Sequence, residues 1–385
     1  MSSPEAFRSR FPIFENKVFL NSCSKGALSD SVEAAYGAYL DSWKTEGSPW
    51  DDWVSMLEKT RAAFASHIGC ASDEVAVSFC ASTATAGLVS ALSFDGARNR
   101  IAIGDFEFPT LVHNLLAQEK RGASIVRVRA AANRLSTESY IQKLDERVRL
   151  VPVAHVCFRN GYRQDLAAVV EVARAVGAYS LIDDYQSTGT CALDVRALQC
   201  DFLVTGTLKY LLGSSGLGFL YVRRELLEDA ELEPLVTGWF GQEKPFDFDI
   251  ERATYHASAR RFETGTPPVP NLYAGLAALE LVAALDPRSV AAHVETLASR
   301  LIGEASERGW QVLTPEEPER RGPLVVLSCT DATRVVETLA EHDIVVSARD
   351  SGLRVSFHYY NVADDIDALL SVLDTHAGLM ARMSA

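Results

Sequence analysis

The sequence predicts an α/β protein in which a large domain, built on a mostly parallel sheet, is joined to a smaller α+β domain. Three observations lead to this prediction. The chain has 385 residues, 48% hydrophobic and 23% charged, which suits a globular protein with a substantial buried core. Short runs rich in Val and Ile alternate with Ala-rich amphipathic stretches over most of the chain. After about residue 265 this alternation gives way to two long helical patterns and several short strand patterns.

The strand candidates of the first part alternate with helical stretches, as they do in a doubly wound sheet. They are "VAVSF", "NRIAIGDF", "ASIVRVRA", "LVPVAHVCF", "YSLIDDY" and "DFLVTGT", with helical stretches such as "ASTATAGLVSAL" and "LAAVVEVARAVGA" between them. Apolar strands alternating with helices indicate a parallel sheet buried on both faces. The run "GFLYVRREL" is a further strand candidate that can lie antiparallel to the others.

The second part combines helical and strand patterns. "NLYAGLAALELVAAL" and "VAAHVETLASRLIGEASERG" have helical periodicity, whereas "PLVVLSC", "DIVVSAR" and "LRVSF" read as short strands. We therefore expect a large domain over residues 20–262 and a small α+β domain formed by residues 1–19 and 263–385.

Charge and cysteine usage exclude several classes of function. The net charge of −14, from 51 acidic and 37 basic residues, argues against nucleic-acid binding and against an anionic membrane surface. The seven cysteines are scattered, without a CxxC pair or a Cys/His cluster at zinc spacing. No apolar run has the length of a signal peptide or a membrane span. We expect a cytoplasmic protein with reduced thiols and no metal.

Four features follow predicted strands, where open α/β sheets bind their ligands. Lys209 lies between an apolar run and a Gly-rich stretch in "TGTLKYLLGSSGLGFLYV", and a lysine shielded from water becomes nucleophilic toward aldehydes. Asp183 ends the strand in "LIDDYQSTG" and needs a cationic partner, such as a protonated ring nitrogen. Ser82 and Thr83, at a strand-to-helix turn, can present hydroxyl and N–H groups to a phosphate. Phe108 in "DFEFPT" can stack on a flat ring.

Each feature alone has a plainer structural interpretation. Asp183 or Asp184 can cap a turn, the hydroxyl residues can form an N-cap, and a Phe after a strand usually belongs to the core. Together, a lysine for a Schiff base, an aspartate for a pyridinium nitrogen, a helix N-terminus for phosphate and an aromatic ring for stacking describe a pyridoxal phosphate site. A nicotinamide site is disfavoured, because no GxGxxG follows an early strand.

The chain resembles the class V aminotransferase-like, fold-type I pyridoxal phosphate enzymes, which include kynureninases, cysteine desulfurases and isopenicillin-N-epimerase-like proteins. The resemblance runs from "VFLNSCSKGALS" to "LRVSFHYYNVADDIDALLSVL" and implies the fold-type I transferase fold. It implies that Lys209 in "LKYLLGSSGLGFLYV" forms the Schiff base, and that Asp183 and Gln186 of "DDYQ" meet the pyridine nitrogen and the ring hydroxyl. His155 in "AHVCFRNGYRQDL" is expected to line the cofactor pocket, and Thr207 is expected among the cofactor-binding residues.

The kynureninase branch gives the nearest local similarities. "FPT" at 108–110, "GWFGQEKPF" and "RRFETGTPPVPNLYAGLAAL" are similar to segments that hold the cofactor in that branch. The last two imply a phosphate site completed across a homodimer interface, with Trp239 and Thr266 contributed by the neighbouring subunit. Arg354 in "LRVSFHYYN" matches the arginine that grips the substrate carboxylate, and a guanidinium fork suits that role.

The sequence also departs from the family pattern. Leu208 stands where His or Tyr commonly precedes the lysine, and Leu111 stands where kynureninases tend to have Asp. "SCSKG" places Cys23 and Lys25 where Asn and Leu are expected, so kynurenine itself is disfavoured as the substrate. The stretch "VVSARDSGLRVS" lacks the cysteine that a persulfide-forming desulfurase needs.

The resemblance implies an enzyme of amino-acid metabolism that works through an external aldimine and a Cα carbanion. We favour a kynureninase-like lyase that breaks a C–C or C–S bond. Transamination and epimerisation remain open, as does decarboxylation, because pocket shape and secondary acids select the branch. An alternative of another class is a catalytically silent pyridoxal phosphate-binding regulatory protein, although Lys209, Asp183 and Arg354 are all present.

Overall fold

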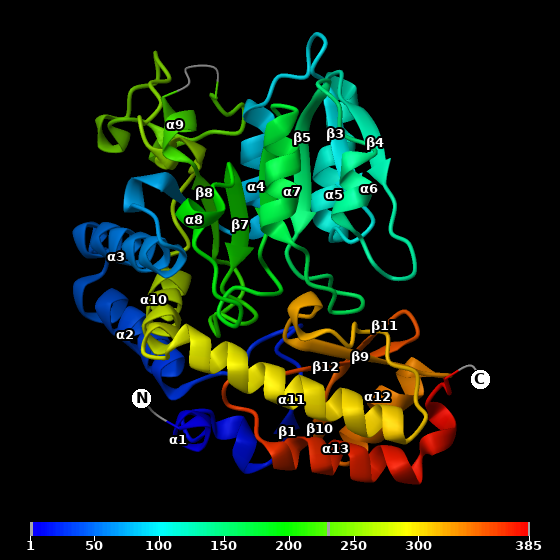
Figure 1. The fold of residues 1–385 in the computed structure, drawn as a ribbon. Helices are drawn as coiled ribbons and strands as arrows, with labels where there is room; N and C mark the ends of the chain where they lie inside the picture. The colour runs from blue at the N-terminus through cyan, green and yellow to red at the C-terminus, as the bar shows by residue number, and fades with distance from the viewer. Residues whose placement is uncertain (1–2, 229–231, 384–385) are drawn as a thin grey trace.

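The computed structural model describes residues 3–228 and 232–383, and its ribbon has an upper part around a large sheet and a lower part around a small one (Figure 1). Residues 1–2, 229–231 and 384–385, which fall within the predicted domains, lie outside the described residues. The large sheet has seven strands in the order β2-β8-β7-β6-β5-β3-β4. They are β2 (Val75–Ser78), β3 (Arg100–Gly104), β4 (Ser124–Val128), β5 (Val148–Ala154), β6 (Tyr179–Asp183), β7 (Phe202–Gly206) and β8 (Gly218–Val222).

Only β8 breaks the parallel arrangement of this sheet. It pairs antiparallel with both β2 and β7, whereas all other neighbouring strands pair parallel. The predicted mostly parallel sheet is therefore confirmed, as is the antiparallel placement of "GFLYV". Because β2 and β7 both oppose β8, β2 runs in the same direction as the parallel strands.

The strands are apolar throughout because helices cover both faces of the sheet. In β7, Leu203 packs on one face with α3 (Trp50–Ile68), α7 (Leu166–Ala175) and α10 (Val269–Ala283). Phe202 and Val204 pack on the other face with α4 (Ala81–Ala91) and α5 (Pro109–Leu116). Each fully buried Leu, Val or Phe contributes about 1.5–3 kcal/mol relative to exposure. This gain makes the near-continuous Val/Ile pattern a signature of the parallel sheet.

The smaller part contains an antiparallel sheet and a parallel strand pair. The sheet has the order β11-β12-β9, formed by β9 (Leu324–Ser328), β11 (Ser347–Arg349) and β12 (Gly352–Ser356). β1 (Val18–Phe19) pairs with β10 (Ile344–Val345). The helices packed in this part are α11 (Pro287–Glu307), α12 (Ala332–Glu341) and α13 (Ala363–Thr375). The remaining helices of the described chain are α1 (Pro4–Arg8), α2 (Asp30–Glu46), α6 (Thr137–Ile141), α8 (Val195–Leu198) and α9 (Arg224–Leu227).

The N-terminal segment packs with the C-terminal part. Phe7 and Phe11 share a core cluster with residues of α11 and α13, and Arg8 pairs with Asp365 at 2.9 Å. In contrast, α10 packs against α2 and α3 of the larger part. The domain boundary between residues 262 and 263 stays a prediction.

Among the described helices, none alone is long and apolar enough to cross a membrane. α10 and α11 meet that criterion only as a pair, by length and composition, with a bend of 83° between them.

His358 joins the small part to the loop that carries Lys209. Its ring is buried, Nε2 donates to the Tyr210 carbonyl at 2.9 Å, and Nδ1 accepts from the Tyr359 N–H at 2.8 Å. Burial lowers the pKa of His358 to about 4, because the charged ring would lose its hydration without gaining a negative partner.

We predict that this histidine makes the fold sensitive to mild acid. Below its ordinary pKa of 6.5, the unfolded chain takes up a proton that the folded chain refuses until about pH 4. Stability from this group is complete above that range and falls by roughly 3 kcal/mol between pH 7 and pH 4. Urea unfolding of the wild type and of His358→Gln at several pH values checks this. The variant should have a flatter dependence, and equal slopes for both proteins would contradict the prediction.

Candidate active site

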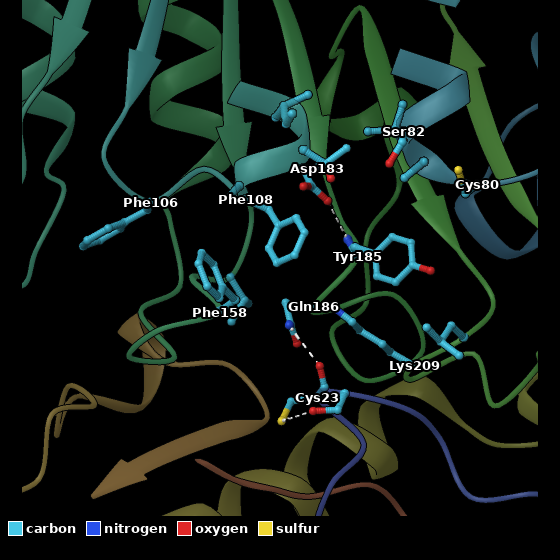
Figure 2. Close-up of a pocket in the computed structure, with 18 of the residues that line it drawn as sticks. Cys23, Cys80, Ser82, Phe106, Phe108, Phe158, Asp183, Tyr185, Gln186 and Lys209 are labelled. Atoms are coloured by element: carbon cyan, nitrogen blue, oxygen red, sulfur yellow. Dashed lines mark hydrogen bonds between the residues drawn. The ribbon is translucent and has the colours of Figure 1, made fainter. Parts of the chain in front are cut away.

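A cavity of about 340 Å³ lies where the carboxyl edge of the large sheet faces the small part (Figure 2). It contains six of the predicted site residues, namely Ser82, Phe108, Asp183, Gln186, Lys209 and Arg354. The other described residues that line it are Cys23, Ser24, Cys80, Ala81, Thr85, Phe106, Thr110, Leu111, Ala154, Val156, Phe158, Tyr185, Val204, Leu208 and Arg349. The side chains converge because β2, β3, β5, β6 and β7 all end at this edge.

Lys209 reaches the cavity from the loop after β7. Its Nζ lies 4.6 Å from the centre of the Tyr185 ring and 5.6 Å from that of Phe108. Burial lowers the pKa of Lys209 to about 8, although the negative charge of Asp183 opposes this change. A substantial fraction of the amine is therefore neutral near physiological pH.

Gly26 lets the N-terminal segment close on this lysine. The Gly26 N–H donates to the Leu208 carbonyl at 2.8 Å, and a Cβ at position 26 would overlap the Lys209 carbonyl oxygen. The glycine in "SCSKG" thus allows a close approach of two backbones.

Asp183 and Asp184 take different positions at the end of β6. Asp183 lines the cavity, and its Oδ1 accepts the Tyr185 N–H at 3.1 Å (Figure 2). Burial raises the pKa of Asp183, although that hydrogen bond and the Lys209 charge favour its ionised form. Asp184 instead binds His155, whose Nδ1 lies 2.6 Å from Asp184 Oδ1. His155 is buried beside the cavity but is not among the residues that line it.

Gln186 has one amide atom that the described protein leaves without a partner. Its Nε2 donates to the Cys23 carbonyl at 3.1 Å, as Figure 2 shows. Its Oε1 is buried and has no hydrogen-bond partner among the described residues. Buried amide oxygens are nearly always hydrogen-bonded, so a donor group from a ligand fits this position.

Two of the three predicted threonines, Thr83 and Thr207, use their hydroxyls within the fold. Thr83 Oγ1 lies 2.7 Å from Ser78 Oγ and accepts the Cys80 N–H at 3.2 Å, which closes the first turn of α4. Thr207 Oγ1 donates to the Ser214 carbonyl at 2.8 Å and shapes the loop that carries Lys209. Neither residue lines the cavity, whereas Ser82 does.

Trp239 and Thr266 also lie outside the cavity lining of this chain. Trp239 packs against Phe240 and Phe248, with ring centres 4.4 and 5.7 Å away, and Thr266 is exposed. The segment around Trp239 exposes further apolar side chains, which are Leu235, Val236, Phe246, Phe248 and Ile250.

Arg354 is a buried cation held only by neutral acceptors. It is 3% exposed, and its Nη2 donates to Ser24 Oγ at 2.8 Å and to Ser347 Oγ at 3.0 Å. Its Nε has no hydrogen-bond partner among the described residues, and no described carboxylate forms an ion pair with it. A buried charge without a counter-ion is costly, so an anionic ligand suits this side of the cavity.

Several lining residues escaped the sequence analysis. Tyr185 lies between Asp183 and Gln186 in the chain, and its place in the "DDYQ" motif was the available signal. Phe158 meets Phe108 edge-on, with ring centres 5.0 Å apart. Ser24 and Arg349 come from segments whose position beside Lys209 depends on tertiary packing.

The family model of class V aminotransferases matches residues 50–369. The chain belongs to this family. It is 32% identical to an uncharacterized aminotransferase, YcbU, of Bacillus subtilis (strain 168), over 94% of this chain and 95% of the relative. It is 27% identical to a kynureninase of Bacillus anthracis, over 94% of this chain and 88% of the relative.

The solved structures bear out the fold. The apo structure of a cysteine desulfurase from Thermococcus onnurineus NA1 superimposes with a TM-score of 0.87 at 20% identity, covering 98% of both chains. The predicted fold-type I architecture is therefore confirmed. Class V aminotransferases depend on pyridoxal phosphate, so this chain is a pyridoxal phosphate enzyme.

The cavity fits this cofactor. A lysine amine with a lowered pKa suits its aldehyde, and the half-buried Asp183, which lines the cavity, suits its pyridine nitrogen. The unpartnered Oε1 of Gln186 can accept the proton of its ring hydroxyl. The first turn of α4, with Ser82, offers N–H groups and the positive end of the helix dipole to its phosphate.

We predict that the side chain of Lys209 loses its proton at an unusually low pH in protein freed of cofactor. Reductive methylation followed by peptide mass spectrometry should give a midpoint near pH 8 for Lys209. The variant Asp183→Asn should lower that midpoint further, because it removes the negative charge that favours the protonated amine. A midpoint at the ordinary lysine pKa of 10.5 would contradict the burial described above.

Proposed function

We propose that the enzyme acts on a small amino acid as a kynureninase-like lyase that breaks a C–C or C–S bond. Kynureninases match the chain over nearly its whole length, and the "FPT" and "GTPPV" segments are similar to that branch. The observation that carries the proposal is the half-buried Lys209, whose amine shares one cavity with the Asp183 carboxylate and Arg354. A second candidate is transamination, favoured by the 32% identity to YcbU. Epimerisation remains a further alternative within the family.

We assign the binding of the cofactor to side chains that line the cavity. Lys209 would hold its aldehyde covalently through Nζ, Asp183 would meet the ring nitrogen, and Gln186 the ring hydroxyl. Phe108 would stack on the ring, and Ser82 with the first turn of α4 would bind the phosphate. His155, Thr83 and Thr207 would act as positioning residues, since their side chains bind Asp184, the α4 cap and the Lys209 loop.

The chain's own groups would then guide the reaction. When bound, pyridoxal phosphate withdraws electrons from the α-carbon of the amino acid joined to it. Asp183 would keep the ring nitrogen protonated, and Lys209 would carry the proton at the α-carbon. Arg354 would hold the carboxylate and so set which α-carbon bond lies perpendicular to the ring. Phe108, Tyr185 and their aromatic neighbours would keep water away from the reacting atoms.

We further propose a homodimer that works in the cytoplasm. Trp239 and Thr266 would complete the phosphate site of the neighbouring subunit, and the exposed apolar side chains of the Trp239 segment would be covered there. All seven cysteines are free, as expected in a reducing compartment.

The function is tested by an amino-acid panel with mass-spectrometric identification of products. A lyase releases a side-chain fragment or ammonia without an amino acceptor, whereas transamination yields a keto acid and consumes an acceptor. A yellow protein that changes neither colour nor any amino acid would support the regulatory alternative.

We predict that Lys209→Ala abolishes covalent retention of the cofactor. Borohydride treatment of the wild type should leave the cofactor mass on the peptide that contains Lys209, and the variant should show no such peptide. Turnover should fall by at least about 10²-fold, because a general acid–base group is lost. Attachment at another lysine would overturn the assignment.

If each site takes Lys209 from one subunit and Thr266 from its neighbour, we predict that two inactive variants complement each other. A Lys209→Ala chain supplies an intact Thr266, and a Thr266→Asp chain supplies an intact Lys209. Refolding the two together should restore activity that neither has alone, because one site of each mixed dimer is complete. A mixture as inactive as its components would place Thr266 outside its neighbour's site.

A further inference from the structure

Two arginines share one face of the β11–β12 hairpin. In its antiparallel register Ser347 faces Arg354, and Arg349 faces Gly352. Paired residues and residues two apart on a strand point to the same side of a sheet. Arg349 and Arg354 therefore flank Ser347 on the side that lines the cavity. Diagonal neighbours of this kind lie about 7–8 Å apart.

No acidic side chain of the described protein neutralises Arg349. The next residue, Asp350, approaches Arg159 instead, with Oδ2 and Nε 3.7 Å apart. Asp105 in the adjoining hollow pairs with Arg129 at 2.9 Å. Asp183 is the one acidic residue among the described residues that line the cavity, and it is the last residue of β6 at the edge of the large sheet. Arg349 is exposed and stands on the small-part side of the cavity, opposite that edge.

One cation among the described residues that line the cavity has no group assigned to it by the proposed function. Lys209 and Asp183 are assigned to the cofactor, and Arg354 to the carboxylate on the α-carbon. This leaves the Arg349 guanidinium, which is close enough to contribute to the lowered pKa of Lys209. A guanidinium is a fork of donors that suits a second carboxylate or a similar oxyanion.

We propose that Arg349 binds the side-chain acid of the substrate, so that the enzyme prefers amino acids with a second acidic group. The proposal rests on the function proposed above, because it assigns the other end of the same substrate. Arg354 and Arg349 then hold the two acidic ends of one short molecule, with the Ser347 hydroxyl between them. An uncharged side chain would leave Arg349 facing water.

Kinetics of the holoenzyme with acidic and neutral amino acids test this assignment. Among the amino acids that the panel identifies as substrates, those with a second acidic group should have a higher kcat/KM than neutral ones. Arg349→Gln should lower that ratio for the acidic amino acids by about 10-fold or more, mainly through KM, because it removes a charged hydrogen bond. For neutral substrates kcat/KM should change by less than about twofold, as expected for a contact that they do not make. Arg349→Lys should recover part of the loss, since it restores the charge without the fork.

A binding assay separates this inference from the proposed function. Succinate lacks an amine and cannot react, so calorimetry on the holoenzyme reports only the two anion positions. Succinate should bind more tightly than propionate, and Arg349→Gln should weaken succinate alone. Arg129→Gln is the matched control, because this exposed arginine lies in the adjoining hollow beside Arg349 and should leave both ligands unaffected.

Three results would overturn the inference. Equal losses for acidic and neutral substrates would make Arg349 part of the α-carboxylate position. Unchanged kinetics in Arg349→Gln, or equal affinities for succinate and propionate, would leave it without a substrate role. If the holoenzyme processes no amino acid at all, the proposed function fails, and the succinate measurement alone decides the role of Arg349.

Discussion

The burial of the Lys209 amine beside the Asp183 carboxylate is the constraint on which the rest of the site depends. Removing either charge from water is costly, and the attraction between them offsets that cost only in part. Burial consequently lowers the pKa of the lysine and raises that of the aspartate. A ligand with an electrophilic carbonyl and a basic ring nitrogen satisfies both groups at once. The site is therefore poised for pyridoxal phosphate by the same desolvation that would destabilise a protein without a ligand there.

The fold supports this arrangement by bringing remote segments to one loop. β6 and β7 are adjacent in the sheet, so the residues after them meet at its carboxyl edge. Gly26 contacts the lysine loop from the N-terminal side, and His358 binds the Tyr210 carbonyl from the C-terminal side. Gln186 is tied to the Cys23 carbonyl. The loop that carries Lys209 is thus contacted from both the N-terminal and the C-terminal segments, so the small part is needed to close the cavity.

The sequence predicted the fold class and the centre of the site because both depend on local patterns. Apolar strands alternating with helices reveal a parallel sheet, and strand ends mark the positions of Asp183 and Lys209. The sequence did not reveal which hydroxyl side chains form hydrogen bonds inside the protein rather than face the cavity. Thr83 and Thr207 carry suitable hydroxyls, but nearby backbone and side-chain groups use them. Arg349 and Ser24 could not be assigned, since only the packing of the small part brings them to the cavity.

A crystal structure of the holoenzyme at high resolution tests the central claim most directly. We expect continuous density from Lys209 Nζ to the cofactor, with the ring nitrogen within hydrogen-bond distance of an Asp183 carboxylate oxygen. The Gln186 Oε1 atom should also gain a partner on the cofactor. Density for the cofactor elsewhere, or a Lys209 side chain turned to solvent with Asp183 unpaired, would contradict it.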